Sequence, residues 1–229
     1  MTDHDRPTTT DGITTSRFRA TEGVGEHWPV IDGATTFFAT DSFATSARLI
    51  EGIAGIGGIE DHRPDIDIRP DGVTIRLVTR ADDWWGMTER DVRIASGILA
   101  AAASLDLRSD PSVVQAVDPI VIGAVDIDRI RPFWAALMGY IARPDSPKED
   151  LVDPRRRNPG IWFETMDEVP LGRNRMHVAV WLPYEQAESR VAAAVAAGGT
   201  VIFDRAPAWW TLADPEGNEA DIATIVSRD

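Results

Sequence analysis

The sequence predicts an α+β protein of two domains, a βαββα domain followed by a domain built from two paired βαβββ modules. Both halves combine strand-like alternation of apolar residues with apolar residues at helical spacing. Turn residues interrupt this pattern over 108–117, where we place the linker. A weak internal duplication in the second half predicts the paired modules. The predicted segments are a disordered tail at 1–19, a first domain at 20–110 and a second domain at 117–227.

The first domain begins with a predicted strand over 34–39. Asp41 or Ser42 can cap the helix that follows, because short polar side chains accept hydrogen bonds from the free N–H groups of a first turn. Apolar residues then recur at helical spacing, and glycines end the pattern. The residues that we expect on the apolar face of this helix are Phe43, Ala47, Ile50 and Ala54.

An edge strand over 66–69 and a Pro-Asp-Gly turn lead to an alternating strand over 73–79. Thr88 and Asp91 then form a capping box in which Asp replaces the usual Glu, and this opens the second long helix. The residues that we expect to face the core from this strand and helix are Val73, Ile75, Leu77, Ile94, Ala95, Ile98, Leu99 and Ala102.

The second domain repeats one pattern of a strand, a helix and about three further strands. In the first copy the strand covers 120–125 and the helix ends at Gly139. In the second copy the strand covers 176–182 and Pro183 suits the first helical turn. One such unit leaves a sheet face bare, so two units are expected to pair. The last strands of the second copy are 200–203, 209–213 and 219–225.

Composition excludes several classes of function. The chain has 229 residues with 37 acidic and 23 basic side chains, so its net charge is −14. That charge argues against a nucleic-acid partner or an anionic membrane surface. The absence of cysteine excludes disulfides, thiolate zinc sites and cysteine nucleophiles, and it fits a cytoplasmic location. No apolar run approaches the roughly 20 residues that span a bilayer, and no apolar signal core follows the first residue.

Three segments of the first half stand at a characteristic spacing. They are Phe37-Phe38 ahead of Ser42-Phe43-Ala44, Asp61-His62-Arg63-Pro64, and 73–80 leading to Gly86-Met-Thr-Glu-Arg-Asp91. Because of these segments, the chain from about Trp28 to Leu107 resembles the pterin-4a-carbinolamine dehydratase family. The resemblance implies a hydro-lyase reaction that removes water from 4a-hydroxytetrahydrobiopterin, which needs an acid for the leaving hydroxyl and a base for the N5 proton.

The resemblance assigns roles to five positions. His62 matches the first histidine of the family and Asp91 matches its aspartate, which implies that both are catalytic. Arg63 and Arg80 stand where the family has its second and third histidines, and Pro64 follows as in the family. A guanidinium stays protonated near neutral pH and cannot act as a base, whereas an imidazole can. We therefore expect Arg63, Pro64 and Arg80 to bind the ligand, with the arginines orienting a carbonyl or an anion.

Each of these charged residues also has a purely structural interpretation. Asp91 would serve only as the helix cap, and His62 would be an ordinary loop residue. Arg80 would pair on the surface with Asp82 or Asp83.

The second half carries a different set of motifs. They are Asp126 with Phe133-Trp134 and Leu137-Met-Gly139-Tyr140, then Arg173-Asn-Arg-Met-His177-Val, and finally Trp210-Thr-Leu-Ala-Asp214-Pro-Glu-Gly-Asn-Glu219. With these motifs, nearly all of 118–226 resembles the glyoxalase-like branch of the vicinal-oxygen-chelate superfamily. The resemblance implies a cup made by two βαβββ modules, in which metal-using members hold a divalent ion.

The metal-ligand positions of that superfamily fall on Pro119, Glu164, His177 and Asp221. Glu164, His177 and Asp221 could form a three-ligand site for a divalent metal with open positions. The alternative is a metal-free cup with His177 hydrogen-bonded in its wall. We favour the metal-free cup, because Pro119 has no side chain that can coordinate, and we expect no other cofactor.

Three functional hypotheses follow. The chain is a dehydratase acting on a pterin through His62 and Asp91, or a degenerate dehydratase domain that binds a small ligand without turnover. In the third hypothesis the C-terminal cup carries the chemistry as a metal-assisted lyase or oxygenase. We expect a small-molecule partner, pterin-like or another ring, and both resemblances imply a homodimer.

Overall fold

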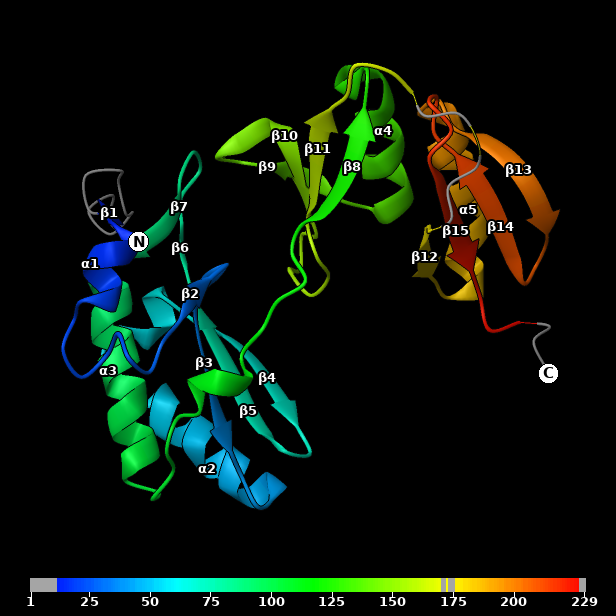
Figure 1. Ribbon diagram of the computed structural model, residues 1–229. Coiled ribbons are helices and arrows are strands. Elements are labelled where there is room, and N and C mark those ends of the chain that lie inside the picture. Colours follow the sequence, from blue (N-terminus) through cyan, green and yellow to red (C-terminus); the bar gives the residue numbers. More distant parts are fainter. Residues whose placement is uncertain (1–11, 170–171, 173–175, 227–229) are drawn as a thin grey trace. The chain divides into compact units, whose positions relative to one another are not determined.

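The computed structural model describes residues 12–169, 172 and 176–226. The chain divides into two compact units, 1–116 and 117–229, and the division falls inside the predicted linker. Both units contain helices packed on antiparallel or mixed sheets, which confirms the α+β class (Figure 1). Within the described residues, no helix is long and apolar enough to cross a bilayer.

Unit 1 is built on a four-stranded antiparallel sheet in the order β2-β3-β5-β4, and β1, β7 and β6 form a second, three-stranded sheet. A short connection from β5 into β6 joins the two sheets. The elements are β1 (Gly12–Ile13), α1 (Thr15–Arg19), β2 (Val30–Ile31), β3 (Gly33–Ala39), α2 (Phe43–Ala54), the 3₁₀ helix η2 (Ile59–Asp61), β4 (Asp65–Arg69), β5 (Gly72–Leu77), β6 (Thr79–Arg80), β7 (Trp85–Thr88), α3 (Glu89–Ala103) and the 3₁₀ helix η3 (Pro111–Val113).

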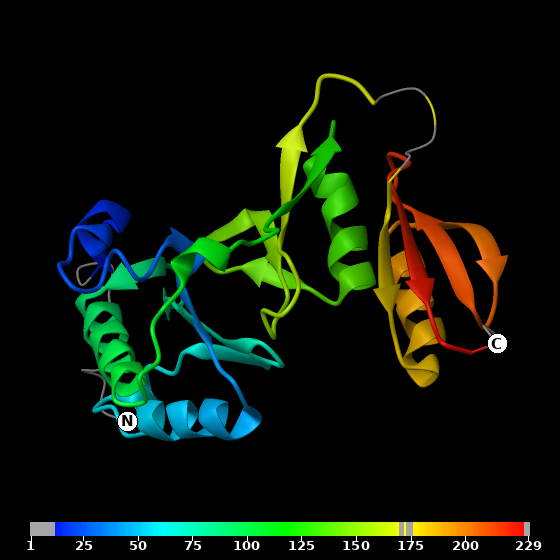
Figure 2. The same cartoon turned by 60° about the horizontal axis from the view of Figure 1, so that its bottom comes forward.

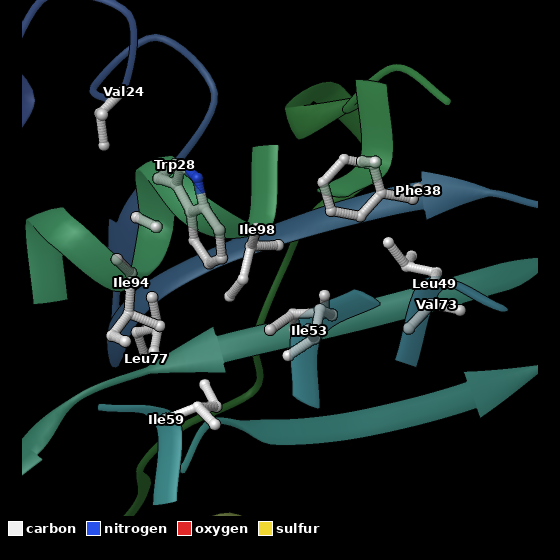
Figure 3. Packing of buried hydrophobic residues seen from close by; sticks show 14 of the residues in the cluster. Val24, Trp28, Phe38, Leu49, Ile53, Ile59, Val73, Leu77, Ile94 and Ile98 are labelled. Atoms are coloured by element: carbon white, nitrogen blue, oxygen red, sulfur yellow. The ribbon is translucent and has the colours of Figure 1, made fainter. Parts of the chain in front are cut away.

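Helices α2 and α3 cover the same face of the four-stranded sheet. Alternation along β5 buries Val73, Ile75 and Leu77 completely, as the period-two pattern predicts. Figure 3 shows Leu49 and Ile53 of α2 and Ile94 and Ile98 of α3 meeting the strand side chains in one core. The core thus holds η2 and the start of α3, which carry the candidate site, against one sheet.

Two expectations for unit 1 differ from the structure. Residues 12–19, which we expected in a disordered tail, form β1 and α1, and the Phe18 side chain is fully buried. The remainder of that tail, 1–11, lies outside the described residues. The apolar face expected for α2 is also not the buried one, since Phe43 is 76% exposed. The buried residues of α2 are Thr45, Ser46, Leu49 and Ile53.

Unit 2 contains two modules with the same topology, as the internal duplication predicts. The sheet of the first module runs β8-β11-β10-β9, and the sheet of the second runs β12-β15-β14-β13 (Figure 2). The elements are β8 (Ile120–Ala124), α4 (Ile127–Met138), β9 (Ile141–Arg143), β10 (Ser146–Val152), β11 (Ile161–Thr165), β12 (Val178–Trp181), α5 (Tyr184–Ala196), β13 (Thr200–Arg205), β14 (Trp209–Ala213) and β15 (Glu219–Ala223).

The two modules share one hydrophobic core, in which α4 packs on α5. The Trp134 indole N–H of α4 donates to Asp214 Oδ2 of the second module at 2.9 Å. The Glu216 carboxylate accepts the backbone N–H groups of Val125 and Asp126, at 2.8 and 2.7 Å, where α4 begins. A carboxylate at a helix N-terminus is favourable for both hydrogen bonding and charge. Polar contacts and apolar packing therefore both hold the modules together.

Candidate functional site

A buried His–Asp pair lies between η2 and α3 of unit 1. His62 directly follows η2, and Asp91 is the third residue of α3. His62 Nε2 and Asp91 Oδ1 are 2.6 Å apart, although 29 residues separate them in the chain. Asp91 is completely buried and His62 is 9% exposed. The structure therefore brings together the two residues that the sequence suggests as catalytic.

Asp91 is held by hydrogen bonds from two threonines as well as from His62. Its Oδ2 atom accepts the Thr88 backbone N–H at 2.7 Å and the Thr88 hydroxyl at 2.8 Å. The Asp91 backbone N–H donates in turn to the Thr88 hydroxyl oxygen at 3.4 Å, which completes the predicted capping box. The Thr79 hydroxyl donates to the same oxygen at 2.6 Å. Burial alone would raise the pKa of Asp91, but the hydrogen bonds from His62, Thr79 and Thr88 outweigh it and lower that pKa. Asp91 is thus an ionised, immobile acceptor.

This arrangement prepares the His62 ring for proton transfer. A carboxylate on one ring nitrogen fixes the tautomer and stabilises the imidazolium that forms when the ring is protonated. Because Nε2 faces Asp91, Nδ1 is the ring atom left for a ligand. The site can therefore donate or accept one proton at a defined atom.

The three predicted ligand-binding residues differ in their burial and in their partners. Arg63 is 74% exposed in its side chain and pairs with Glu60, so it points toward solvent. Pro64 is half-buried between His62 and β4. Arg80 donates to Asp65 Oδ2 at 3.0 Å, and its guanidinium carbon lies 5.4 Å from the centre of the Trp85 ring.

Asp65 anchors a cluster of charges that sequence reasoning missed. Its carboxylate accepts hydrogen bonds from Arg80 and Arg76, and Arg76 also reaches Asp32 at 2.6 Å. Burial would raise the pKa of Asp65, but the two arginines outweigh it and lower that pKa. The Arg80 guanidinium is consequently held in place by a partly buried ion pair. The sequence signal for this cluster is the charge at every second residue of β4 and the single arginine in the alternating strand β5.

Of the predicted metal ligands in unit 2, the structure brings together His177 and Asp221 but not Glu164. His177 Nε2 is 3.2 Å from Asp221 Oδ2, while His177 Nδ1 is 3.8 Å from Glu219 Oε2. The two ring nitrogens face different carboxylates, and an imidazole binds one metal ion through only one nitrogen. Glu164 lies on β11, in the sheet of the other module.

These residues do not fit a divalent metal within one copy of the chain. Among the residues that the structure describes, no group of three or more His, Asp or Glu side chains is close enough to hold one. The motif residues 173–175 lie outside that description.

Comparison with known protein families finds two matches along the chain. Residues 13–101 match the family model for pterin 4 alpha carbinolamine dehydratase, and residues 119–223 match the model for a glyoxalase-like domain. These matches confirm both resemblances drawn from the sequence motifs. A search of curated proteins found no relative of the chain.

Solved structures similar to the chain match about half of it. An enzyme of the glyoxalase/bleomycin resistance protein/dioxygenase family from Burkholderia phytofirmans is 21% identical, with a TM-score of 0.38 over 48% of this chain and 100% of its own. A glyoxalase-related enzyme from Fulvimarina pelagi is 20% identical, with a TM-score of 0.37 over 48% and 88%. The fosfomycin resistance protein FosX from Listeria monocytogenes, solved with Mn(II), is 12% identical, with a TM-score of 0.39 over 48% and 90%.

Proposed function

Because the chain joins a pterin-4a-carbinolamine dehydratase domain at 13–101 to a glyoxalase-like domain at 119–223, we propose that the first domain binds a pterin ring and removes water from a 4a-hydroxytetrahydropterin. The observation that carries this proposal is the 2.6 Å contact between His62 and the fully buried Asp91. Such a pair supplies both an acid and a base from one imidazole, which the carboxylate orients.

The reaction needs two proton transfers at the substrate. His62, protonated at Nδ1, gives that proton to the 4a-hydroxyl oxygen, the C4a–O bond breaks with its electron pair on oxygen, and water leaves. The neutral imidazole then accepts the N5 proton, which gives the quinonoid dihydropterin and restores protonated His62. Asp91 keeps the ring oriented through both steps and stabilises its charged form.

The two arginines do not take part in these transfers, because a guanidinium neither gives up nor accepts a proton at physiological pH. Arg80 instead presents a fixed positive charge, since Asp65 and Trp85 hold it in place. We assign it to a carbonyl oxygen of the pterin ring. The replacement of two family histidines by Arg63 and Arg80 also favours the second candidate, a domain that binds the ring without turning it over.

The test measures dehydration of 4a-hydroxytetrahydropterin by the full chain and by His62→Ala. Loss of the acid and base should lower the rate at least about 100-fold, the low end of general acid–base contributions. His27→Ala is a matched control, because His27 lies in the same unit but bonds to Ser109. An unchanged rate in His62→Ala contradicts the dehydratase proposal. A wild-type chain that binds pterin without turnover supports the second candidate.

We propose a homodimer as the assembly, in which sheet edges of unit 2 pair between copies. Strands β8 and β12 each stand at the end of a sheet, so one edge of each is not paired with another strand in the described chain. The Ile120 N–H bonds to Gly160 on the β11 side, so the next N–H, that of Val121, faces the outer edge. Val121→Pro removes that donor and should give a monomer by light scattering. A wild-type monomer, or a Val121→Pro dimer, contradicts edge pairing at β8.

A further inference from the structure

Asp65 connects two segments of unit 1 that belong to different sheets. It is the first residue of β4 and stands directly opposite Arg76 of β5 in the four-stranded sheet. Its Oδ2 atom accepts hydrogen bonds from Arg76 Nη2 and from Arg80 Nη2, each at 3.0 Å. Arg80 belongs to β6, in the three-stranded sheet. One carboxylate oxygen therefore bridges the point at which the chain passes from one sheet to the other.

The groups around this bridge hold it in a defined geometry. Arg76 Nη1 donates to Asp32 Oδ2 at 2.6 Å, so Arg76 lies between two aspartates. Trp85, opposite Arg80 on β7, lies against the Arg80 guanidinium. The side chains of Arg76 and Arg80 are 22% and 16% exposed, and that of Asp65 is 37% exposed. Partly buried charges are screened less by water and salt than surface charges, so this bridge is stronger than a surface ion pair.

The two segments that Asp65 connects are also those that hold the buried His–Asp pair. His62 lies three residues before Asp65 in the chain. Thr79 directly precedes Arg80, and its hydroxyl donates to Asp91 Oδ2 at 2.6 Å. The contact between Asp65 and Arg80 is therefore adjacent in the chain to a group on each side of the pair.

Together these contacts form a closed cycle. Its sides are two short stretches of chain, 62–65 and 79–80. The Asp65–Arg80 contact joins them at one end, and Asp91 joins them at the other. The first stretch contains a proline, whose fixed φ angle reduces its freedom. In such a cycle the contacts are coupled, because breaking one releases both stretches and weakens the others.

We infer that Asp65 is a positioning residue for the His62–Asp91 pair and acts through Arg80. Its carboxylate fixes β6 against the start of β4, and it thereby holds the His62 ring and the Thr79 hydroxyl on Asp91 at the same time. Any effect on turnover rests on the proposed function, whereas the effect on the His62–Asp91 contact does not.

The experiment follows the His62 ring proton by ¹H NMR in the full chain without substrate. A proton on Nε2 that bonds to Asp91 at 2.6 Å should give a low-field signal and exchange slowly with water, because both side chains are buried. Asp65→Asn should speed this exchange about tenfold, since members of one hydrogen-bond network are coupled. Arg80→Gln breaks the same contact from its other side, so it should have a similar effect, and the double variant should add nothing further.

Asp67→Asn is the matched control. Asp67 lies two residues after Asp65 on β4 and pairs with Arg69, but both side chains are more than half exposed. This variant should leave the exchange rate and the dehydration rate unchanged. In the dehydration assay, Asp65→Asn should lower kcat about tenfold, because a displaced acid and base transfers protons less often. Asp65→Glu keeps the charge and should recover part of that loss.

The inference is overturned if Asp65→Asn leaves the exchange rate unchanged, or if Asp67→Asn raises it as much. Additive effects of Asp65→Asn and Arg80→Gln would also overturn it, because Asp65 would then act independently of Arg80. A wild-type chain without the low-field signal has no such contact to position, which is equally decisive against it.

The buried Trp28 indole reports whether each variant folds. If Asp65→Asn does not fold, Arg80→Gln decides, and an unchanged exchange rate in that variant overturns the inference. Faster exchange in a chain whose wild type has no dehydratase activity supports the inference and contradicts the proposed function. Unchanged exchange in an active chain has the opposite meaning.

Discussion

Removal of the Thr79 hydroxyl tests how the His–Asp pair is held. The Thr79 side chain is 1% exposed and donates to Asp91 Oδ2 at 2.6 Å. Thr79→Val keeps the shape but removes a hydrogen bond to a charged acceptor, which is worth about 1.5–3 kcal/mol. We expect the free energy of unfolding of unit 1 to fall by about that amount. The pKa of Asp91 should rise, because one of the hydrogen bonds that lower it is lost.

The assay is urea unfolding followed by NMR at the Trp28 indole, because Trp28 is fully buried in the core of unit 1. Thr36→Val is the matched control. Thr36 is also fully buried, but its hydroxyl has no hydrogen-bond partner among the described residues. That variant should be neutral or more stable, since a buried hydroxyl without a partner costs free energy. Equal effects of Thr79→Val and Thr36→Val would refute the reasoning.

Three further predictions concern the same unit. The double variant Arg63→His and Arg80→His should raise the dehydration rate measured with 4a-hydroxytetrahydropterin, and a variant that binds pterin with no gain would show that the arginines do not limit turnover. The pKa of Asp91 is lower in the folded chain than its ordinary value of 3.8. The ionised carboxylate therefore stabilises the fold fully above pH 3.8, and this stabilisation is lost as the pH falls below that value. Asp91→Asn should make the urea midpoint depend less on acid pH. Phe18→Ala should destabilise unit 1 by about 3–5 kcal/mol in urea, and a neutral result would mean that α1 does not contribute to its stability.

Periodicity in the sequence predicts strands better than it predicts the buried face of a short helix. The alternation of Val73, Ile75 and Leu77 marks the core face of β5 correctly, because period two leaves only two choices. In α2, the pattern of apolar residues alone predicts the wrong buried face. Ser46 is buried there because its hydroxyl bonds to Thr40 at 2.8 Å, and such a satisfied polar group can face the core while Phe43 remains exposed.

The sequence suggests the members of the candidate site better than it suggests their contacts. The capping-box pattern predicts the position of Asp91, and the family resemblance singles out His62. Their contact depends on the path of the chain through β4, β5, β6 and β7, which no local pattern specifies. Thr79 was missed because a neutral hydroxyl in an alternating strand has no distinctive spacing. The segment 12–19 was missed because its two apolar anchors, Ile13 and Phe18, stand among polar residues.

Because the two modules of unit 2 share one core, they should be able to associate as separate polypeptides. Trp134 and Glu216 join the modules by side-chain hydrogen bonds, and both modules contribute large apolar residues to one interior. The peptide connection between β11 and β12 is therefore not what keeps the halves associated. Two polypeptides, one ending and the other beginning at that connection, should associate when they are expressed together. They could then serve as a split reporter for protein proximity.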